Sequence, residues 1–249
     1  MTDISHLVVI GCSFSYGDGL DNPKDQSWAG LLSKKLNVPV VNLSTRGGGN
    51  DRIMRRLYEY HYLNSSNNNN PFYIIAYSHS SRREEYFKSA ENYMVVDMKY
   101  DPVLSKKEPF SLDCIRNYDP IVAVRKKLMI RSYIADFFSA NKLNYLTTDF
   151  MPDTEAELDY LRETYPIAYD RIYSDKFRIQ DLEKISRNYP KLPCGHDGVD
   201  AQLVMAEYIH DEILSKYPSI ATTHQDHITL KQYTEHYNIV GSSGDIEWL

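Results

Sequence analysis

The sequence predicts an α/β fold, a three-layer α/β/α sandwich of the flavodoxin-like kind with a central parallel sheet of about five strands. Short apolar runs, such as residues 6–10 and 72–77, recur along the chain. A continuous apolar run of this length is typical of a strand that is buried on both faces of a parallel sheet. Segments with apolar residues at helical spacing separate these runs, and this alternation predicts helices on both faces of the sheet.

The order of the elements follows from the same patterns. Residues 64–70 are serine and asparagine and predict a polar loop. The predicted strands and helices are, in chain order, a strand at 6–10, a helix at 28–36, a strand at 38–41, a helix at 51–63, a strand at 72–77, a helix at 121–138, a strand at 144–148 and a helix at 203–213.

We expect a single domain over residues 1–218, because a doubly wound fold of this length is often one unit. Two insertions interrupt it. Residues 80–119 are irregular and predict some local helix. Residues 153–193 are rich in Tyr, Asp and Glu and predict a lid or side insertion over one end of the sheet. Residues 219–249 are polar and predict a C-terminal extension that packs elsewhere or on a partner.

Composition narrows the class of protein. The chain has 249 residues, a formal net charge of −6 and three cysteines. The negative charge argues against a general nucleic-acid binder, which usually presents a basic face. The irregular cysteine spacing argues against a disulfide framework. No secretory signal is visible and no segment approaches the ~18 apolar residues of a membrane-spanning helix. We therefore expect a soluble cytoplasmic protein whose 21 tyrosines serve packing.

A serine stands in the turn that leaves the first predicted strand. The strand ends at Gly11, and Cys12, Ser13, Phe14 and Ser15 follow. In open α/β sheets ligands bind at the carboxyl edge of the strands, so the turn places the Ser13 hydroxyl where a base can reach it. Serine and glycine are also ordinary loop and helix-capping residues, and this segment alone leaves both interpretations open.

The order of the motifs resembles the SGNH (GDSL-type) hydrolase family at four places along the chain. The family's first block, Gly-Asp-Ser-x-Ser, is similar to residues 11–15. Its second block, an Asn followed five residues later by a Gly, is similar to Asn42 and Gly47. Its third block, Gly-x-Asn-Asp, is only partly matched by residues 76–79. Its last block, a histidine before an Ala-Glu-containing helix, is similar to residues 195–209.

This resemblance implies a serine esterase that acts on small O-acyl esters, acylated carbohydrates among them, without a cofactor or a metal. Ser13 takes the place of the nucleophile and His196 that of the general base. The resemblance assigns the oxyanion to the backbone N–H groups of Ser13 and Gly47 and to the Ser78 hydroxyl. Ser78 replaces a longer amide donor, and losing an oxyanion donor typically costs about 100- to 1,000-fold in turnover.

The supporting positions differ from the family pattern. Cys12 replaces the aspartate of the first block. The family's histidine is oriented by an aspartate two or three residues before it, where this chain has a Pro-Cys pair ending at Cys194. Asp197 follows His196 and Asp149 follows a strand, so a substituted acid is chemically available but not assigned. A Ser–His dyad without an acid is a workable but weaker nucleophile.

Other interpretations compete with an active esterase. A catalytically degenerate SGNH-like domain, used as a structural or binding component such as part of a virion, fits the altered supporting positions. Cys12, Cys194 and His196 could approach one another, but their spacing matches no common zinc motif. The glycine run at 47–49 could cradle a phosphate, but no Lys-Ser or Lys-Thr pair follows it.

The chain is also similar to phage-encoded SGNH-like proteins, in residues 11–19 and at Arg83-Glu84 among other places. That similarity implies the host cytoplasm or a virion as its location. The expected partner is a small-molecule ester or an acylated glycan, with a second copy of the chain or a virion protein as further candidates. We expect no nucleic-acid partner and no membrane partner.

Overall fold

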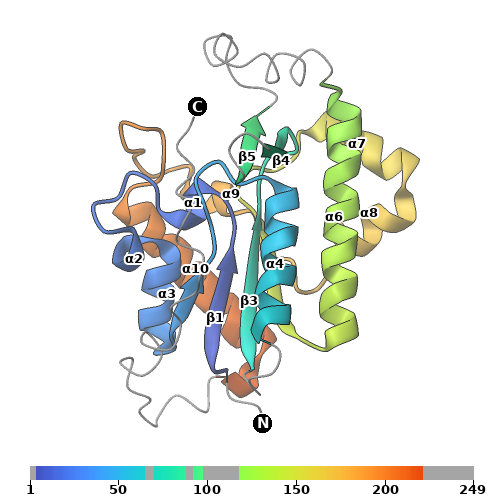
Figure 1. Ribbon diagram of the computed structural model, residues 1–249. Helices are drawn as coiled ribbons and strands as arrows, with labels where there is room; N and C mark the ends of the chain where they lie inside the picture. Colours follow the sequence, from blue (N-terminus) through green and yellow to red (C-terminus); the bar gives the residue numbers. More distant parts are fainter. Residues whose placement is uncertain (1–3, 65–69, 88–91, 98–117, 221–249) are drawn as a thin grey trace.

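The central sheet of the protein is parallel and four-stranded, in the order β2-β1-β3-β6. The computed structural model describes residues 4–64, 70–87, 92–97 and 118–220 (Figure 1). The strands of the sheet are β1 (His6–Ile10), β2 (Val40–Asn42), β3 (Pro71–Tyr77) and β6 (Asn144–Asp149). Each coincides with a predicted strand. Most of the predicted loop at 64–70 and of the extension at 219–249 lies outside the described residues.

Helices cover both faces of the sheet, which gives the predicted α/β/α sandwich (Figure 1). Of the described residues, none belongs to a helix long and apolar enough to cross a membrane. The helices are α1 (Ser13–Tyr16), α2 (Pro23–Gln26), α3 (Trp28–Leu36), α4 (Asn50–Asn64), α6 (Pro120–Asn141), α7 (Glu155–Thr164), α8 (Pro166–Tyr173), α9 (Leu182–Ser186), α10 (Val199–Lys216) and the short 3-10 helix η2 (Pro218–Ile220).

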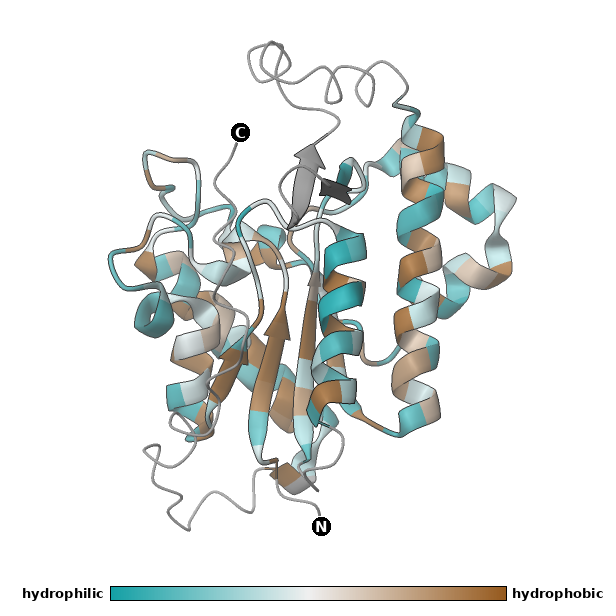
Figure 2. Ribbon diagram, in the orientation of Figure 1, coloured by the Kyte–Doolittle hydropathy of each residue, from teal (hydrophilic) through white to brown (hydrophobic). Residues whose placement is uncertain are grey.

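The core has two halves, one on each face of the sheet. Side chains of β1 alternate between them, with Leu7 and Val9 packing toward α3 and α10 and Val8 and Ile10 packing toward α4 and α6. A strand whose alternate side chains are both covered must be apolar throughout, which is why β1 reads as a continuous apolar run. Figure 2 shows the resulting contrast between the brown strands and the largely teal outer side of α4.

Local signals set the ends of the long helix α6. Asp119 precedes it and its carboxylate accepts hydrogen bonds from the N–H groups of Ile121 and Val122. Pro120 occupies the first turn, where no intrahelical donor is needed. The helix ends at Lys142, which has a φ of 53° in the left-handed region.

The sheet ends beside β6 with a single bridge in place of a fifth strand. The Thr147 N–H donates to the Phe177 carbonyl at 3.0 Å, and the Ile179 N–H donates to the Thr147 carbonyl at 2.9 Å. At this bridge the segment around Arg178 runs parallel to β6. The prediction of about five strands therefore corresponds to four strands and one bridged segment within the described chain.

The described part of the insertion predicted at 80–119 is a β-hairpin, and the prediction of some local helix stays a prediction because residues 98–117 lie outside the described residues. The hairpin consists of β4 (Arg82–Phe87) and β5 (Asn92–Asp97), paired antiparallel. Glu84 joins the hairpin to α4. The Glu84 carboxylate accepts hydrogen bonds from Arg52 and Arg55, and the Glu84 N–H donates to Asp51. Long-range ion pairs of this kind leave no periodic signal in the sequence.

The predicted insertion at 153–193 is a lateral layer packed on α6 (Figure 1). Helices α7 and α8 bury Leu161 and Ile172 against Val124 and Leu128 of α6, which makes a small third core. A capping box at Thr154 begins α7, with its hydroxyl accepting from the N–H of the residue three positions on. This segment is a side insertion, and α9 continues from it toward α10.

A buried ion cluster joins α6 to the end of β6. Lys127 and Arg131 of α6 face Asp149, the last residue of β6. The Lys127 Nζ atom lies 3.1 Å from an Asp149 oxygen and 2.9 Å from an Asp153 oxygen, and Arg178 approaches Asp149 at 3.4 Å. Burial disfavours the carboxylate, but the charges of Arg131 and Lys127 outweigh it and hold the pKa of Asp149 well below its usual range.

Candidate active site

Two glycines shape the turn that carries Ser13. A Cβ atom on Gly11 would lie 2.6 Å from Ser15 Oγ and 3.1 Å from Ala76 Cβ, so no larger residue fits where β1 ends. Gly17 ends the single turn of α1 with a φ of 86°, a conformation that favours glycine. Ser13 stands at the first position of α1, directly beyond the carboxyl end of β1, and is 4% exposed.

A tight loop before α10 presents His196. Lys191 and Asp197 form an isolated antiparallel bridge across its base, and their side chains form an ion pair. The Leu192 N–H donates to the His196 carbonyl at 2.8 Å. Gly195 has a φ of 83°, which closes the loop. Local hydrogen bonds therefore fix the position of His196 independently of the sheet.

Contacts between side chains bring this loop onto the Ser13 turn. The Phe14 ring lies 4.8 Å from the His196 ring, centroid to centroid. An Asp18 oxygen lies 3.8 Å from His196 Nε2. A Cβ atom on Gly19 would lie 2.5 Å from Cys194 Sγ, so this thiol rests against the backbone beyond the turn. The beginning and the end of the described chain thus meet at the carboxyl edge of the sheet.

The His196 imidazole is partly enclosed and only partly satisfied. Its Nδ1 atom is buried and has no hydrogen-bond partner among the described residues. Among the described residues, no hydrogen bond joins Nδ1 to Ser13. Hydrogen bonds between catalytic residues are often long until substrate binds. Burial lowers the pKa of His196. The negative charge of Asp18 partly offsets this and the positive charge of Arg82 adds to it, so the pKa stays below its usual value. The neutral form, which can accept a proton, therefore prevails at neutral pH.

The expected oxyanion donors lie at the ends of neighbouring segments. Ser13 and Gly47 have N–H groups that donate to no other backbone group in the chain as described. Gly47 adopts a φ of 64° in the loop after β2. Ser78 follows β3, is fully buried, and its hydroxyl accepts a hydrogen bond from Arg82 at 3.4 Å. The Asn50 amide holds the backbone of Ser78 in place.

None of the supporting residues suggested by the sequence forms a hydrogen bond with His196 Nδ1 among the described residues. Cys12 is fully buried in the core on the α3 and α10 side of the sheet. Cys194 is exposed and free, Asp197 is paired with Lys191, and Asp149 belongs to the ion cluster of α6. Nowhere in the described ranges do three or more His, Cys, Asp or Glu side chains gather in a way that could hold a metal ion.

Sequence reasoning missed two charged residues at this site, Asp18 and Arg46. Arg46 Nε lies 2.7 Å from an Asp18 oxygen, and its guanidinium lies 5.7 Å from the Tyr16 ring centre. The signal in the sequence is the Gly17-Asp18-Gly19 triplet, since both glycines have positive φ. The two glycines reverse the direction of the chain, so that the Asp18 carboxylate lies close to the loop of His196.

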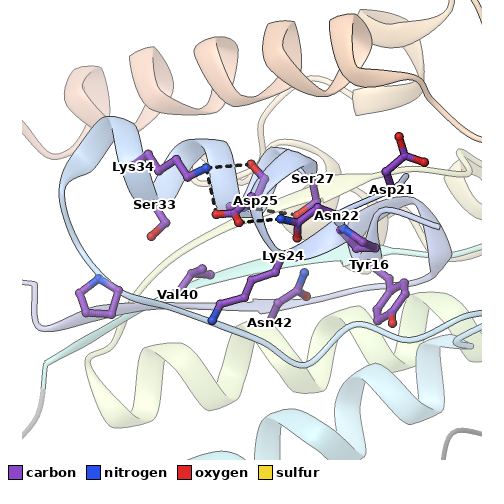
Figure 3. A pocket seen from close by; sticks show the side chains of 13 residues that line it. Tyr16, Asp21, Asn22, Lys24, Asp25, Ser27, Ser33, Lys34, Val40 and Asn42 are labelled. Atoms are coloured by element: carbon purple, nitrogen blue, oxygen red, sulfur yellow. Dashed lines mark hydrogen bonds and ion pairs between the residues drawn. The ribbon is translucent and has the colours of Figure 1, made fainter. Parts of the chain in front are cut away.

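A cavity of about 540 Å³ lies next to this site, along the edge strand β2 and beneath α2 and α3 (Figure 3). Tyr16 and Asn42 line one end of it, and Lys24 extends across it toward β2. Neither Ser13 nor His196 belongs to its lining. The cavity is open, is lined by both polar and apolar atoms, and has a size typical of small-molecule sites.

The sequence matches no family model and no curated protein sequence. Solved structures resemble the fold. The esterase EstA from Pseudoalteromonas sp., inhibited by monoethylphosphonate, is 14% identical, with a TM-score of 0.51 over 86% of this chain and 99% of EstA. A family two carbohydrate esterase from Clostridium thermocellum, in complex with cellohexaose, is 13% identical, with a TM-score of 0.52 over 88% of this chain and 66% of that chain.

A GDSL-like lipase from Bacteroides thetaiotaomicron VPI-5482 is a third similar structure, with 11% identity and a TM-score of 0.48 over 85% of this chain and 89% of the lipase. At identities this low, the likenesses concern the fold. The chain shares its α/β/α fold with EstA and with the family two carbohydrate esterase, in agreement with the fold class that the sequence predicts.

Proposed function

We propose that this protein is a serine esterase of the SGNH type, with Ser13 as nucleophile and His196 as general base. The observation that carries the proposal is the meeting of their two loops at the carboxyl edge of the sheet, where Phe14 packs on the imidazole. The fold shared with esterases supports it. The N–H groups of Ser13 and Gly47, which donate to no other backbone group among the described residues, support it further, because an acyl-transfer site needs donors for the developing oxyanion.

In this mechanism the Ser13 hydroxyl attacks the ester carbonyl while His196 takes its proton. The carbonyl oxygen becomes an oxyanion, which the N–H groups of Ser13 and Gly47 and the Ser78 hydroxyl stabilise. The intermediate collapses, the alcohol leaves with the proton from His196, and the acyl group remains on Ser13. Water, activated by the same imidazole, then attacks the acyl-enzyme and releases the acid.

Small O-acyl esters, including acylated carbohydrates, are the proposed substrates. Ser13 is only 4% exposed, and this burial favours a substrate with a short acyl group. The open cavity beside Tyr16 and Asn42 carries polar side chains such as that of Lys24, which are suited to a hydroxyl-rich leaving group (Figure 3). One similar structure is a carbohydrate esterase with cellohexaose bound, which is consistent with this substrate class.

Labelling of the intact protein with a fluorophosphonate probe tests the nucleophile. We expect covalent labelling of the wild type, none in Ser13→Ala, and a sharp decrease in His196→Ala. Ser215→Ala is the matched control, because Ser215 is an exposed serine of α10. A folded wild type that neither labels nor hydrolyses p-nitrophenyl acetate would overturn the proposal and favour the degenerate SGNH-like domain, with a binding or virion role.

A second assay addresses the substrate class. We expect acetate release from acetylated oligosaccharides to exceed release from p-nitrophenyl esters with long acyl chains. A preference for long chains would contradict the assignment to short acyl groups while leaving Ser13 as the nucleophile.

A further inference from the structure

His196 lacks an acid at the positions just before it in the chain. Pro193 and Cys194 stand there, and the Cys194 thiol packs against Gly19. The Nδ1 atom of His196 is buried without a hydrogen-bond partner in the described residues. An imidazole that takes a proton in such surroundings needs a negative charge nearby, because burial disfavours the imidazolium.

Four charged side chains act on His196, and two of them are negative. Asp18 and Asp197 favour its protonation, whereas Arg82 and Arg46 oppose it. The carboxylate of Asp197 pairs with Lys191, and no ion pair joins it to His196 among the described residues. Asp18 is the carboxylate that approaches the ring itself, at 3.8 Å from Nε2.

Asp18 is held in this position from two directions. Its backbone N–H donates to the Ser13 carbonyl at 3.0 Å, which ties it to the turn of the nucleophile. One carboxylate oxygen lies 2.7 Å from Arg46 Nε in an ion pair, and the other oxygen lies on the side of His196. The Asp18 side chain is 21% exposed. Arg46 immediately precedes Gly47, so this single carboxylate links the nucleophile turn, the oxyanion loop and the histidine.

We propose that Asp18 is the positioning acid of this site, supplied by the nucleophile's own turn in place of an acid before the histidine. It rests on the proposed function. Asp18 stabilises the imidazolium that forms when His196 takes the Ser13 proton, and Arg46 fixes the rotamer in which it does so. At 3.8 Å from Nε2 the carboxylate acts through its charge, and Nδ1, which has no partner among the described residues, is then the nitrogen that takes the Ser13 proton.

The test compares Asp18→Asn, which keeps the shape and removes the charge, with Asp18→Glu, which restores the charge. With p-nitrophenyl acetate we expect kcat to fall roughly 10- to 100-fold in Asp18→Asn at little change in KM, and Asp18→Glu to recover part of the loss. Asp211→Asn is the matched control, because Asp211 pairs with His210 on the surface of α10, at 3.0 Å and 80% side-chain exposure.

A second readout does not require activity. Titration of His196 followed by NMR should show its pKa lowered by about one unit in Asp18→Asn relative to wild type and unchanged in Asp211→Asn. An active wild type whose Asp18→Asn variant keeps kcat within twofold and the same His196 titration would overturn the inference. An inactive wild type would overturn the proposed esterase function instead, and an unmoved His196 pKa in that protein would overturn the placement of Asp18 as well.

Discussion

Replacing Asp149 with asparagine should strongly destabilise the fold, because it leaves buried cations without their main counter-charge. The substitution keeps the side-chain shape while Lys127 and Arg131 remain 1% and 2% exposed. Removing one partner of a buried ion pair costs about 3–5 kcal/mol. Asp153 still lies 2.9 Å from Lys127 and offsets part of this. We therefore expect a loss of about 3 kcal/mol at pH 7, which corresponds to a Tm lower by roughly 6–12 °C.

The stability lost in Asp149→Asn should also depend on pH, in a direction that the lowered pKa of Asp149 determines. The facing cations hold the pKa of Asp149 in the folded protein below the ordinary 3.8 that the unfolded chain would show. A carboxyl with a lowered folded pKa contributes its full stability above the unfolded pKa, and this contribution is lost as the pH falls toward the folded pKa. The difference in unfolding free energy between wild type and Asp149→Asn should therefore be constant from neutral pH to about 5 and narrow below 3.8.

Urea unfolding followed by tryptophan fluorescence measures both effects. Asp136→Asn is the matched control, since Asp136 is 58% exposed and pairs with Arg171 on the surface, and it should change stability by less than about 1 kcal/mol. An Asp149→Asn variant with the wild-type midpoint at pH 7 would refute the reasoning. So would a difference that widens as the solution is acidified.

Three further predictions concern single residues. The kcat/KM of ester hydrolysis should rise with pH through an apparent pKa below 6.5, because burial lowers the pKa of His196; a limb centred above this value would contradict the assignment. Gly30→Ala should lower the Tm even though alanine favours helices by about 1 kcal/mol, because its Cβ would lie 2.0 Å from the Lys24 carbonyl oxygen; a raised Tm would show that α2 does not pack there. Glu84→Gln should reduce the unfolding free energy by about 2 kcal/mol, measured in urea, because the carboxylate is 4% exposed and accepts two hydrogen bonds from Arg55; an unchanged midpoint would show that the hairpin is not anchored by this pair.

The elements that were predictable from sequence are those whose environment repeats along the chain. The runs at 6–10 and 72–77 are apolar at every position because both faces of these strands are covered, and this leaves an unmistakable pattern. Ser13 could be placed at the carboxyl edge of the sheet because it follows a predicted strand, whereas His196 was assigned to the site through the resemblance of its motif to the SGNH family. In each case neighbouring residues in the sequence carry the information.

The features that escaped prediction depend on residues far apart in the chain. Lys127 lies on a helix whose sequence suggests a solvated charge, yet its amine is buried because Asp149 and Asp153 surround it. The hairpin that begins at residue 82 is fixed by the pairing of Glu84 with arginines of α4. Asp18 could be read only as a loop residue until the loop of His196 was placed beside it.

The packing of α3 on α10 determines when this half of the core can form during synthesis. The Trp28 N–H donates to Gln202 Oε1 at 2.7 Å, and Trp28, Leu32 and Ile209 are all fully buried in one cluster. A chain emerging from the ribosome exposes this surface of α3 until α10 has been made, and such surfaces are sites for chaperones or for aggregation. His196 lies just before α10, so the proposed general base is synthesised together with the segment that closes the core. Incomplete chains would therefore be prone to aggregation and would lack the proposed general base. The proposed esterase activity would appear only when the fold is complete.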